Sequence, residues 1–347
     1  MTSRVESGII PLFRVAFFAT KRPITMAKSV GPQMNSKATH ALLNAVPDKP
    51  WLADGGLETV MVFLEGLDLP QFASFPLLDT PQGRDALTRY FTSVLDTAAG
   101  LETGVLLDTA TWRASYGWGR VMGMTPDAID TANRAAVAFA RVLRDRRPGQ
   151  DIVINGVIGP HGDAYAPEVV MDADAAQSYH APQVRVLAAA GVDMISAMTI
   201  STTGEAIGIA NAARDVGLPV ALSFTLETDG RLVSGMDLRD AIALTDAATG
   251  GYPAWYGINC VHPDHFQAIL NGAWVNRIGA IRANASRMSH AELDEATELD
   301  AGNPEELGRE YAELQRLLPA LRVVGGCCGT DIRHLSAIGH ACVHHAH

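Results

Sequence analysis

The amino-acid sequence predicts an α/β protein: a single-domain (β/α)8 TIM barrel spanning residues 47–347, preceded by an N-terminal extension, residues 1–46. Composition is the first reason, because 48% of the residues are hydrophobic, only 6% are aromatic, and Gly and Ala are plentiful. This mixture suits a buried parallel sheet covered by helices. Patterning is the second reason, since after Pro50 short apolar runs rich in β-branched residues alternate with longer stretches of helical periodicity.

Eight apolar runs are the predicted strands, and each is followed within a few residues by Gly, Asp, Asn, Ser or Thr. In order, they are residues 51–53, 104–107, 152–157, 193–197, 219–224, 255–259, 277–283 and 321–324. Eight parallel strands indicate closure into a barrel, a fold that uses about 250 residues or more as one domain.

Seven Ala-rich or periodic stretches between these runs are the predicted helices: residues 83–99, 126–146, 175–190, 203–216, 238–249, 263–271 and 304–318. Pro126, Pro263 and Pro304 stand where the first turn of a helix tolerates proline. Residues 159–171 and 284–303 are predicted to be long loops after strands, and we expect them to lie at the active-site face of the barrel.

The N-terminal extension differs from the rest of the chain in charge. Its first fifty residues hold seven Lys or Arg against Glu6 and Asp48, so the remaining chain carries a net charge of about −16. A transit peptide, a disordered tail, or a start codon placed too early, with Met26 or Met34 as the true start, would each fit. We expect the segment up to about Val46 to be dispensable for the barrel.

Charge and cysteine usage exclude several classes of partner. The net charge is −11, and beyond the first fifty residues no basic cluster interleaves with aromatics, which excludes a nucleic-acid partner. The apolar stretch at residues 8–19 is interrupted by Arg14 and is too short to cross a membrane. Four cysteines, two of them adjacent, are typical of a reducing compartment, so we expect a cytoplasmic protein without membrane association.

Three cysteines at predicted strand ends are the strongest chemical signal. Cys327 and Cys328 follow the eighth strand between glycines, whose conformational freedom permits a turn that aims both sulfurs at one point. Cys260 follows the sixth strand, and both strand ends face the same barrel mouth. Small buried hydrophobic residues are the alternative interpretation. Three thiolates with an open fourth position are the signature of a catalytic zinc site.

At these residues the sequence resembles the homocysteine S-methyltransferase family, which includes the betaine-dependent enzyme and the homocysteine module of cobalamin-dependent methionine synthase. The resemblance covers roughly residues 50–340. Besides the cysteines, it is carried by Asp54-Gly55-Gly56, Asp108-Thr109-Ala110-Thr111, Gly156-Val157-Ile158-Gly159-Pro160, Tyr179-His180, Gln183 and Ser223-Phe224-Thr225.

The resemblance implies a barrel in which Zn²⁺, held by three cysteines, binds the thiol of homocysteine and delivers a thiolate to a methyl donor. A free thiol has a pKa of about 8.5, and coordination to a divalent cation removes its proton. The resemblance also implies that Asp54 helps to hold the substrate amino group, and that amides of the Gly55–Glu58 turn receive the substrate carboxylate.

Two positions depart from the family pattern. After the fourth strand the family commonly has a glutamate that contacts the substrate amine, whereas Met198 stands here and cannot accept that contact. Glu227, just past the fifth strand, is a candidate to supply the missing carboxylate, with a solvated loop residue as the alternative. Asp108 replaces the family's asparagine. Both departures concern the identity of the thiol substrate more than the zinc.

The sequence therefore predicts a zinc-dependent S-methyltransferase that converts homocysteine to methionine, a step of methionine biosynthesis. A sulfonium such as S-methylmethionine or S-adenosylmethionine is the first choice of donor, because a positively charged leaving group needs little further activation. Betaine is an alternative donor, and methylated folate is less favoured, since the chain shows no second domain to hold a folate or cobalamin. Its partners are then a small-molecule thiol and a methyl donor, with a homo-oligomer left open. A different thiol acceptor, a non-catalytic barrel that binds zinc and a small ligand, and a redox protein using Cys327 and Cys328 are the alternatives.

Overall fold

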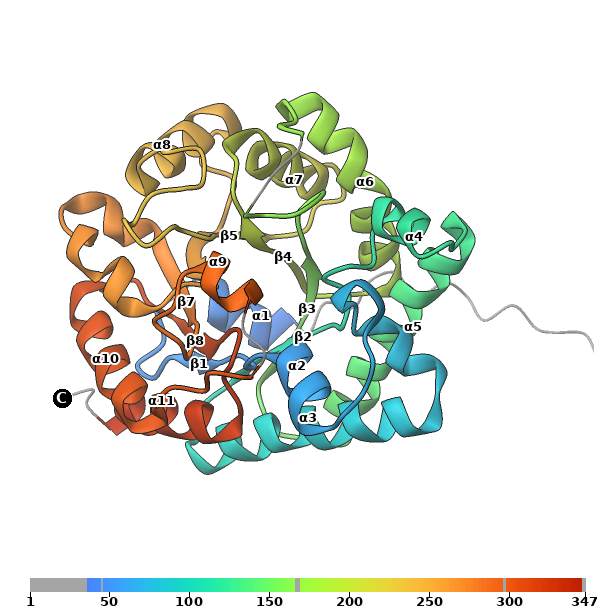
Figure 1. The fold of residues 1–347 in the computed structure, drawn as a ribbon, viewed down its shortest axis with the longest axis horizontal. Coiled ribbons are helices and arrows are strands. Elements are labelled where there is room, and N and C mark those ends of the chain that lie inside the picture. Colours follow the sequence, from blue (N-terminus) through green and yellow to red (C-terminus); the bar gives the residue numbers. More distant parts are fainter. Residues whose placement is uncertain (1–35, 45, 166–168, 296–297, 345–347) are drawn as a thin grey trace, which may run out of the picture. The chain divides into compact units, whose positions relative to one another are not determined.

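The computed structural model describes residues 36–44, 46–165, 169–295 and 298–344, and they form the predicted closed parallel barrel (Figure 1). All eight predicted runs are strands, and Trp51 of the first pairs with Val323 of the last to close the sheet. The strands are β1 (Trp51–Leu52), β2 (Val105–Asp108), β3 (Ile152–Ile158), β4 (Met194–Ile200), β5 (Val220–Phe224), β6 (Trp255–Asn259), β7 (Ile278–Ala283) and β8 (Val323–Gly326).

Long helices cover the outside of the barrel, and six of the seven predicted helices are among them. They are α3 (Pro81–Gly100), α5 (Pro126–Asp145), α6 (Ala173–Ala190), α7 (Thr203–Asp215), α8 (Leu238–Thr249), α10 (Pro304–Leu317) and α11 (Ile332–His344). Their starts follow from local chemistry, because the side chains of Thr80, Thr125, Asp172, Thr202 and Asn303 accept hydrogen bonds from first-turn amides.

The predicted helix at residues 263–271 is instead a pair of short 3-10 turns, Pro263–His265 and Gln267–Ile269. Phe266 between them has φ −131° and a fully buried side chain, so packing of its ring against the core interrupts the helical path. The remaining short elements are α1 (Ser36–Asn44), α2 (Leu57–Thr59), a π-helical turn (Val60–Leu64), α4 (Tyr116–Val121), α9 (His290–Glu295), and 3-10 turns at Pro70–Phe72, Phe75–Asp79 and Ala273–Arg277.

An apolar layer fills the end of the barrel at which the strands begin. Every strand contributes one buried side chain to this base layer: Trp51, Leu106, Val153, Met194, Ala221, Trp255, Ala280 and Val323. Ala38 and Leu42 of α1 belong to the same cluster, and Arg322 donates hydrogen bonds to the carbonyls of Leu42 and Leu43. Helix α1 therefore closes the base of the barrel.

The position of α1 differs from the expectation that residues 1–46 form a separate extension. Leu42 is fully buried, and the compact unit that contains the barrel begins near Pro32. The sequence pattern missed this because nine residues are too few to show a helical period clearly. Residues 1–35, with Met26 and Met34, lie outside the described residues.

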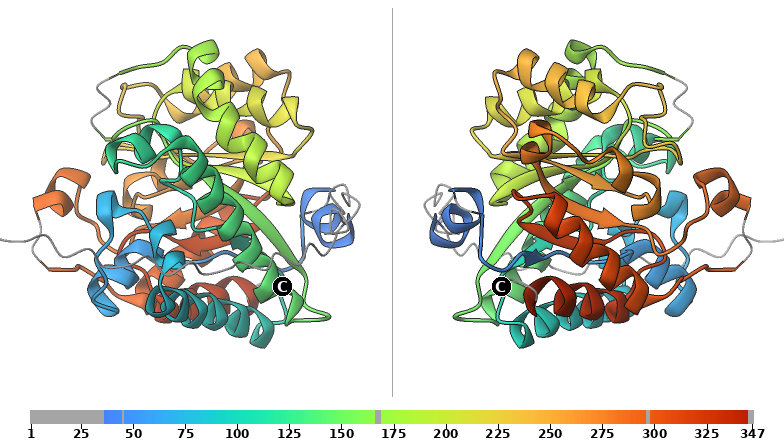
Figure 2. Two further views of the ribbon diagram at one scale, coloured as in Figure 1. Left: turned by 90° about the vertical axis from the view of Figure 1, so that its right-hand side faces the viewer. Right: turned by 90° about the vertical axis from the view of Figure 1, so that its left-hand side faces the viewer.

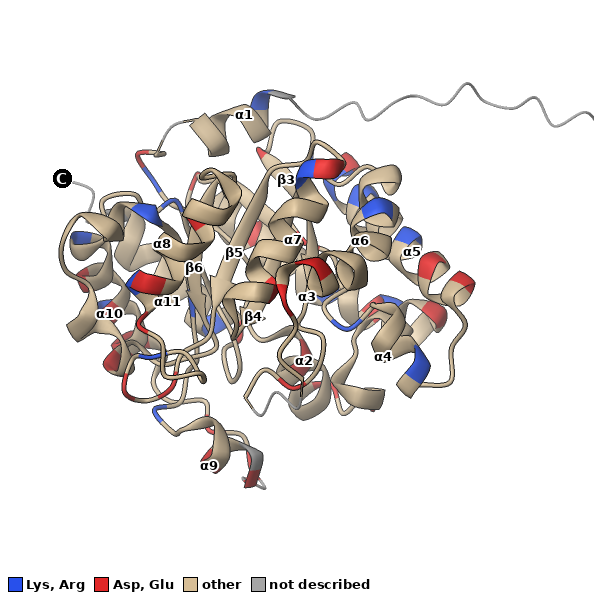
Figure 3. Ribbon diagram, turned by 90° about the horizontal axis from the view of Figure 1, so that it is seen from above, with Lys and Arg blue, Asp and Glu red and all other residues tan. Residues whose placement is uncertain are grey.

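The opposite end of the barrel carries the long loops. Figures 2 and 3 show α1 at one end of the barrel and α9, in the loop between β7 and α10, at the other. None of the helices in the described ranges is both long and apolar enough to cross a membrane.

Candidate active site

A cavity of about 550 Å³ opens at the end of the barrel where the strands terminate. Residues at or just past six strand ends line it: Asp54, Asp108, Met198, Asn259, Arg282 and Gly326. Tyr165 and His290, from the two predicted long loops, also line it. The predicted active-site face is therefore the face that carries the cavity.

The three predicted cysteine ligands converge in this cavity. The Sγ atoms of Cys260 and Cys328 are 3.6 Å apart, and all three sulfurs lie within 4.8 Å of one another. Sulfurs bound tetrahedrally at about 2.3 Å from zinc lie about 3.8 Å apart, so the spacing fits one zinc ion. The donor set fits as well, because soft thiolates select zinc over magnesium or calcium.

Backbone contacts with β7 hold both cysteine segments. The amide of Cys260 donates to the carbonyl of Arg282 (3.1 Å), and the amide of Cys327 donates to the carbonyl of Ala283 (2.8 Å). Cys260 has φ 60°, a left-handed conformation that few residues other than glycine adopt. This strained backbone at the end of β6 directs the thiol toward Cys328, and such strain is typical of functional sites.

The three thiols hold protons unevenly. Hydrogen bonds from Cys260 and Cys328, together with the charge of Arg282, place the pKa of Cys327 well below its ordinary value. Sharing hydrogen bonds with Cys327 raises the pKa of Cys260, and the hydrogen bond with Cys260 raises the pKa of Cys328. The cluster thus concentrates negative charge on one sulfur, and a divalent cation is the group that would stabilise all three as thiolates.

A buried ion network forms the floor of the cavity. The guanidinium of Arg282 pairs with the carboxylates of both Asp54 and Asp108, and Asp108 also accepts a hydrogen bond from Asn155 (2.7 Å). Burial raises the pKa of Asp54 well above its ordinary value, against the opposing effect of Arg282. Asp108, a departure from the family pattern, is explained by this pairing with Arg282.

Gly55 and Gly56 hold the first loop close to the cysteine loop. Their amides donate to the hydroxyls of Tyr90 and Thr330, both at 3.0 Å, and a Cβ at Gly56 would lie 2.5 Å from the carbonyl oxygen of Cys327. Glycine is therefore required here for close packing of the two loops. Both amides therefore already have acceptors within the protein. Their expected role in receiving a substrate carboxylate stays a prediction.

Met198 and Glu227 occupy different surroundings. Met198 lines the cavity, as expected of the position where the family has its glutamate. Glu227 is not among the described residues that line the cavity, because it lies in a turn that hydrogen-bonds back on itself through Arg231 and Gly230. The structure therefore does not bring Glu227 to the position that Met198 leaves without a carboxylate.

Glu58 is a cavity carboxylate that the sequence analysis did not single out. It lies in α2 and accepts a hydrogen bond from Ser74 (2.8 Å), and burial raises its pKa. The charge of Cys327 raises the same pKa further. An acidic residue in the first helical turn after Asp54-Gly55-Gly56 was the available signal.

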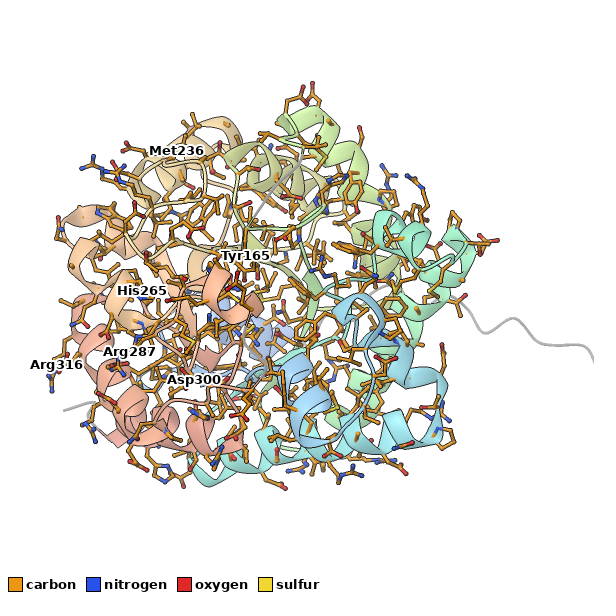
Figure 4. All side chains as sticks on the ribbon, in the orientation of Figure 1. Tyr165, Met236, His265, Arg287, Asp300 and Arg316 are labelled. Carbon is orange, nitrogen blue, oxygen red and sulfur yellow. The ribbon has the colours of Figure 1, made fainter. Side chains whose placement is uncertain are left out.

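Tyr165 and His290 cover the cysteines from two separate loops. Their rings stack with centroids 3.7 Å apart, and Tyr165 lines the same cavity as Cys260. Burial raises the pKa of Tyr165 well above its ordinary value, so it stays a neutral phenol. In Figure 4, Tyr165 lies over the middle of the barrel beside α9. Neither residue was predicted, because their contact joins loops far apart in the sequence.

Other motif residues support the scaffold. Thr109 and Thr111 share a hydrogen bond (2.7 Å) and tie the end of β2 to β3. His180, fully buried in α6, pairs with Glu205 of α7 (2.8 Å). Glu205 also accepts a hydrogen bond from the backbone amide of His161. These contacts position the loop after β3.

A second group of metal-type ligands, His262, Asp264 and Glu310, is arranged as an ion-pair network. The amide of Asp264 donates to Nδ1 of His262, so Nε2 carries the proton and faces Glu310 at 3.4 Å. Arg287 donates to both Asp264 (2.5 Å) and Glu310 (2.8 Å). Arg287 thus supplies the positive charge that these two carboxylates share.

Known proteins match this chain over the whole barrel. The family model described as Homocysteine S-methyltransferase matches residues 51–342. The homocysteine S-methyltransferase of Escherichia coli (strain K12) is 25% identical over 225 residues, 61% of this chain and 68% of that protein. Crystal structures of the homocysteine methyltransferase MmuM from Escherichia coli are similar in fold. The oxidized form has TM-score 0.68 at 21% identity, covering 87% of this chain and 98% of that one, and the metallated form has TM-score 0.64 at 20% identity, covering 87% and 99%.

Proposed function

The chain belongs to the homocysteine S-methyltransferase family, and from this premise we propose that it transfers a methyl group from a sulfonium donor to homocysteine, with zinc bound by Cys260, Cys327 and Cys328. Family membership makes the protein a methyltransferase. The observation that carries the zinc proposal is the convergence of three sulfurs within 4.8 Å at the cavity.

Zinc held by three thiolates would lower the pKa of an acceptor thiol at the remaining position, so that the acceptor is a thiolate at neutral pH. The protein's own groups hold the cysteines ready for this role. Arg282 contributes the positive charge next to Cys327, and the β7 backbone carbonyls fix both cysteine segments. No side chain is required as a base.

The charge balance of the cavity floor favours an amino-acid thiol. Two buried carboxyl groups, Asp54 and Asp108, share the single guanidinium of Arg282, so the cavity floor holds two acids for one cation. An ammonium group bound at Asp54 would supply a second cation and favour the ionised form of that carboxyl group, and Glu58 lines the same cavity. We therefore propose that Glu58, with Asp54, replaces the glutamate that Met198 removes from the family pattern.

The cover over the cysteines supports a sulfonium donor. Tyr165 and His290 stack at the cavity, and Met198 and Phe72 add apolar side chains to its lining. When a thiolate attacks the methyl group of a sulfonium, a new C–S bond forms, the old C–S bond breaks, and both products are neutral thioethers. Opposite charges attract more strongly in a site of low dielectric constant, so such surroundings favour this encounter.

Metal analysis and a thiol-by-donor screen test the proposal. We expect about one zinc per chain, and mass spectrometry should detect methionine from homocysteine with S-methylmethionine or another sulfonium. Cys260→Ala should lose zinc and transfer, whereas Cys342→Ala, which changes a buried cysteine of α11, should keep both. Full zinc and transfer in folded Cys260→Ala would contradict the metal assignment. A zinc-free protein with a reversible disulfide would favour the redox alternative.

A further inference from the structure

Arg113 is a cavity residue whose charge has no partner in the proposed reaction. It follows β2 and lines the cavity, and its Nε and Nη1 atoms are shielded from solvent without a hydrogen-bond partner among the described residues. Within the same ranges, no carboxylate oxygen comes within 4.0 Å of its guanidinium nitrogens; Glu58 and Asp163 are nearby acids. Leaving a desolvated charge without a hydrogen-bonded partner is unfavourable.

Two indole rings hold the Arg113 guanidinium in place. Its central carbon lies 3.7 Å from the ring centroid of Trp118 and 4.3 Å from that of Trp112. Both rings are anchored, because Trp118 donates to the carbonyl of Pro160 (3.2 Å) and Trp112 to the carbonyl of Met198 (3.4 Å). The guanidinium is therefore preorganised, so little conformational entropy is lost when it binds a ligand.

The position of the guanidinium also decides which part of a ligand this wall can recognise. Indole faces attract methylated cations, but here both rings already contact the guanidinium. A guanidinium that has no acidic partner among the described residues instead matches the charge of a carboxylate. The amides of Gly55 and Gly56 already have internal acceptors, so Arg113 offers a ligand carboxylate a charged donor that these two amides do not.

We propose that Arg113 binds the carboxylate of an amino-acid ligand in the cavity and thereby selects for carboxylate-bearing substrates. This inference rests on the proposed function, in which both the thiol acceptor and the sulfonium donor can carry such a carboxylate. Arg113 is then a specificity-determining residue, while Cys260, Cys327 and Cys328 carry the metal.

Ligand pairs that differ only in the carboxylate test the proposal. For the acceptor, L-homocysteine is compared with 3-aminopropanethiol; for the donor, S-methyl-L-methionine is compared with its decarboxylated sulfonium. In Arg113→Gln we expect the KM of one carboxylate-bearing ligand to rise roughly tenfold or more, with the KM of its decarboxylated partner unchanged. The arm that responds identifies which ligand Arg113 binds.

Arg113→Lys and Arg120→Gln are the matched variants. The lysine keeps the charge but not the planar fork, so its effect should be smaller than that of glutamine. Arg120 is exposed at the end of α4, and its replacement should change neither KM. Equal losses for ligands with and without the carboxylate, or no change for either pair, would overturn the proposal.

Calorimetric binding keeps this test independent of turnover. Titration of wild type and Arg113→Gln with L-methionine and with 3-(methylthio)propylamine measures carboxylate recognition directly. We expect Kd for L-methionine to rise roughly tenfold in the variant and Kd for the amine to stay unchanged. If no thiol–donor pair is turned over but this difference is found, the reaction assignment fails while the carboxylate site stands. The same Kd shift for both ligands contradicts the site.

Discussion

The two ends of the barrel interior are filled by opposite kinds of side chain. At the base, one apolar residue from each strand packs under Leu42 of α1. At the mouth, Arg282, Asp54 and Asp108 form a buried ion network beneath three cysteines. The base is arranged for stability, whereas the mouth holds two buried acids on one cation, shifted pKa values and strained backbone at Cys260 and Thr199.

Removing the cation at the mouth should have the largest effect on the free energy of unfolding. Arg282→Met leaves two buried carboxylates unpaired, and we expect a loss of about 3–5 kcal/mol at neutral pH in urea unfolding. Arg282 opposes the rise that burial causes in the pKa of Asp54, so without Arg282 this pKa should rise further, and the loss should shrink as pH falls and the carboxyl group is protonated. Arg316→Gln, at an exposed position of α10, is the control. A pH-independent loss would contradict this explanation.

The base is tested by Leu42→Ala, which should lower stability by about 2–5 kcal/mol without changing the KM of either substrate. Leu244→Ala, in α8 and 48% exposed, should change stability far less.

Truncated chains test the contribution of α1. Because Leu42 packs against the base layer, a chain beginning at Pro32 should behave like the full chain, and one beginning at Val46 should be less stable. Equal stability of all three chains would show that α1 contributes little.

Glu58→Gln should affect binding rather than stability. If Glu58 holds the substrate ammonium, we expect the KM of homocysteine to rise roughly tenfold, with zinc content unchanged. Because burial raises the pKa of Glu58, the wild-type KM should rise as pH falls, at pH values above those at which an ordinary glutamate titrates. The variant should lack this component. An unchanged KM over the whole pH range would remove Glu58 from the site.

The smallest effect is expected for Glu227→Gln. Because Glu227 does not line the cavity among the described residues, the variant should keep the homocysteine KM of wild type within about twofold. Glu227 and Glu58 are the two candidates to supply the carboxylate that the family has at the position of Met198, so the two variants distinguish between them. A rise in KM for Glu227→Gln but not for Glu58→Gln would restore the original expectation from the sequence.

Local pattern was sufficient for most of the fold. All eight predicted strands and six of the seven predicted helices are present in the structure. Their signals are local, because apolar runs, proline at N1 and threonine caps each determine structure within a few residues. The helix predicted at residues 263–271 failed where burial of Phe266 outweighed local propensity. Helix α1 was missed because its stability comes from packing under the barrel, which a short segment does not reveal.

The sequence by itself determined that three cysteines lie together: cysteines at the ends of the sixth and eighth strands meet at one mouth once the barrel closes. Only the tertiary structure decided what surrounds them. Arg282 meets Asp108 and Asp54 across 174 and 228 residues of chain, and Tyr165 stacks on His290 from another loop. Such partners are chosen by charge and shape across the cavity, and no periodicity in the sequence records which side chains will face one another.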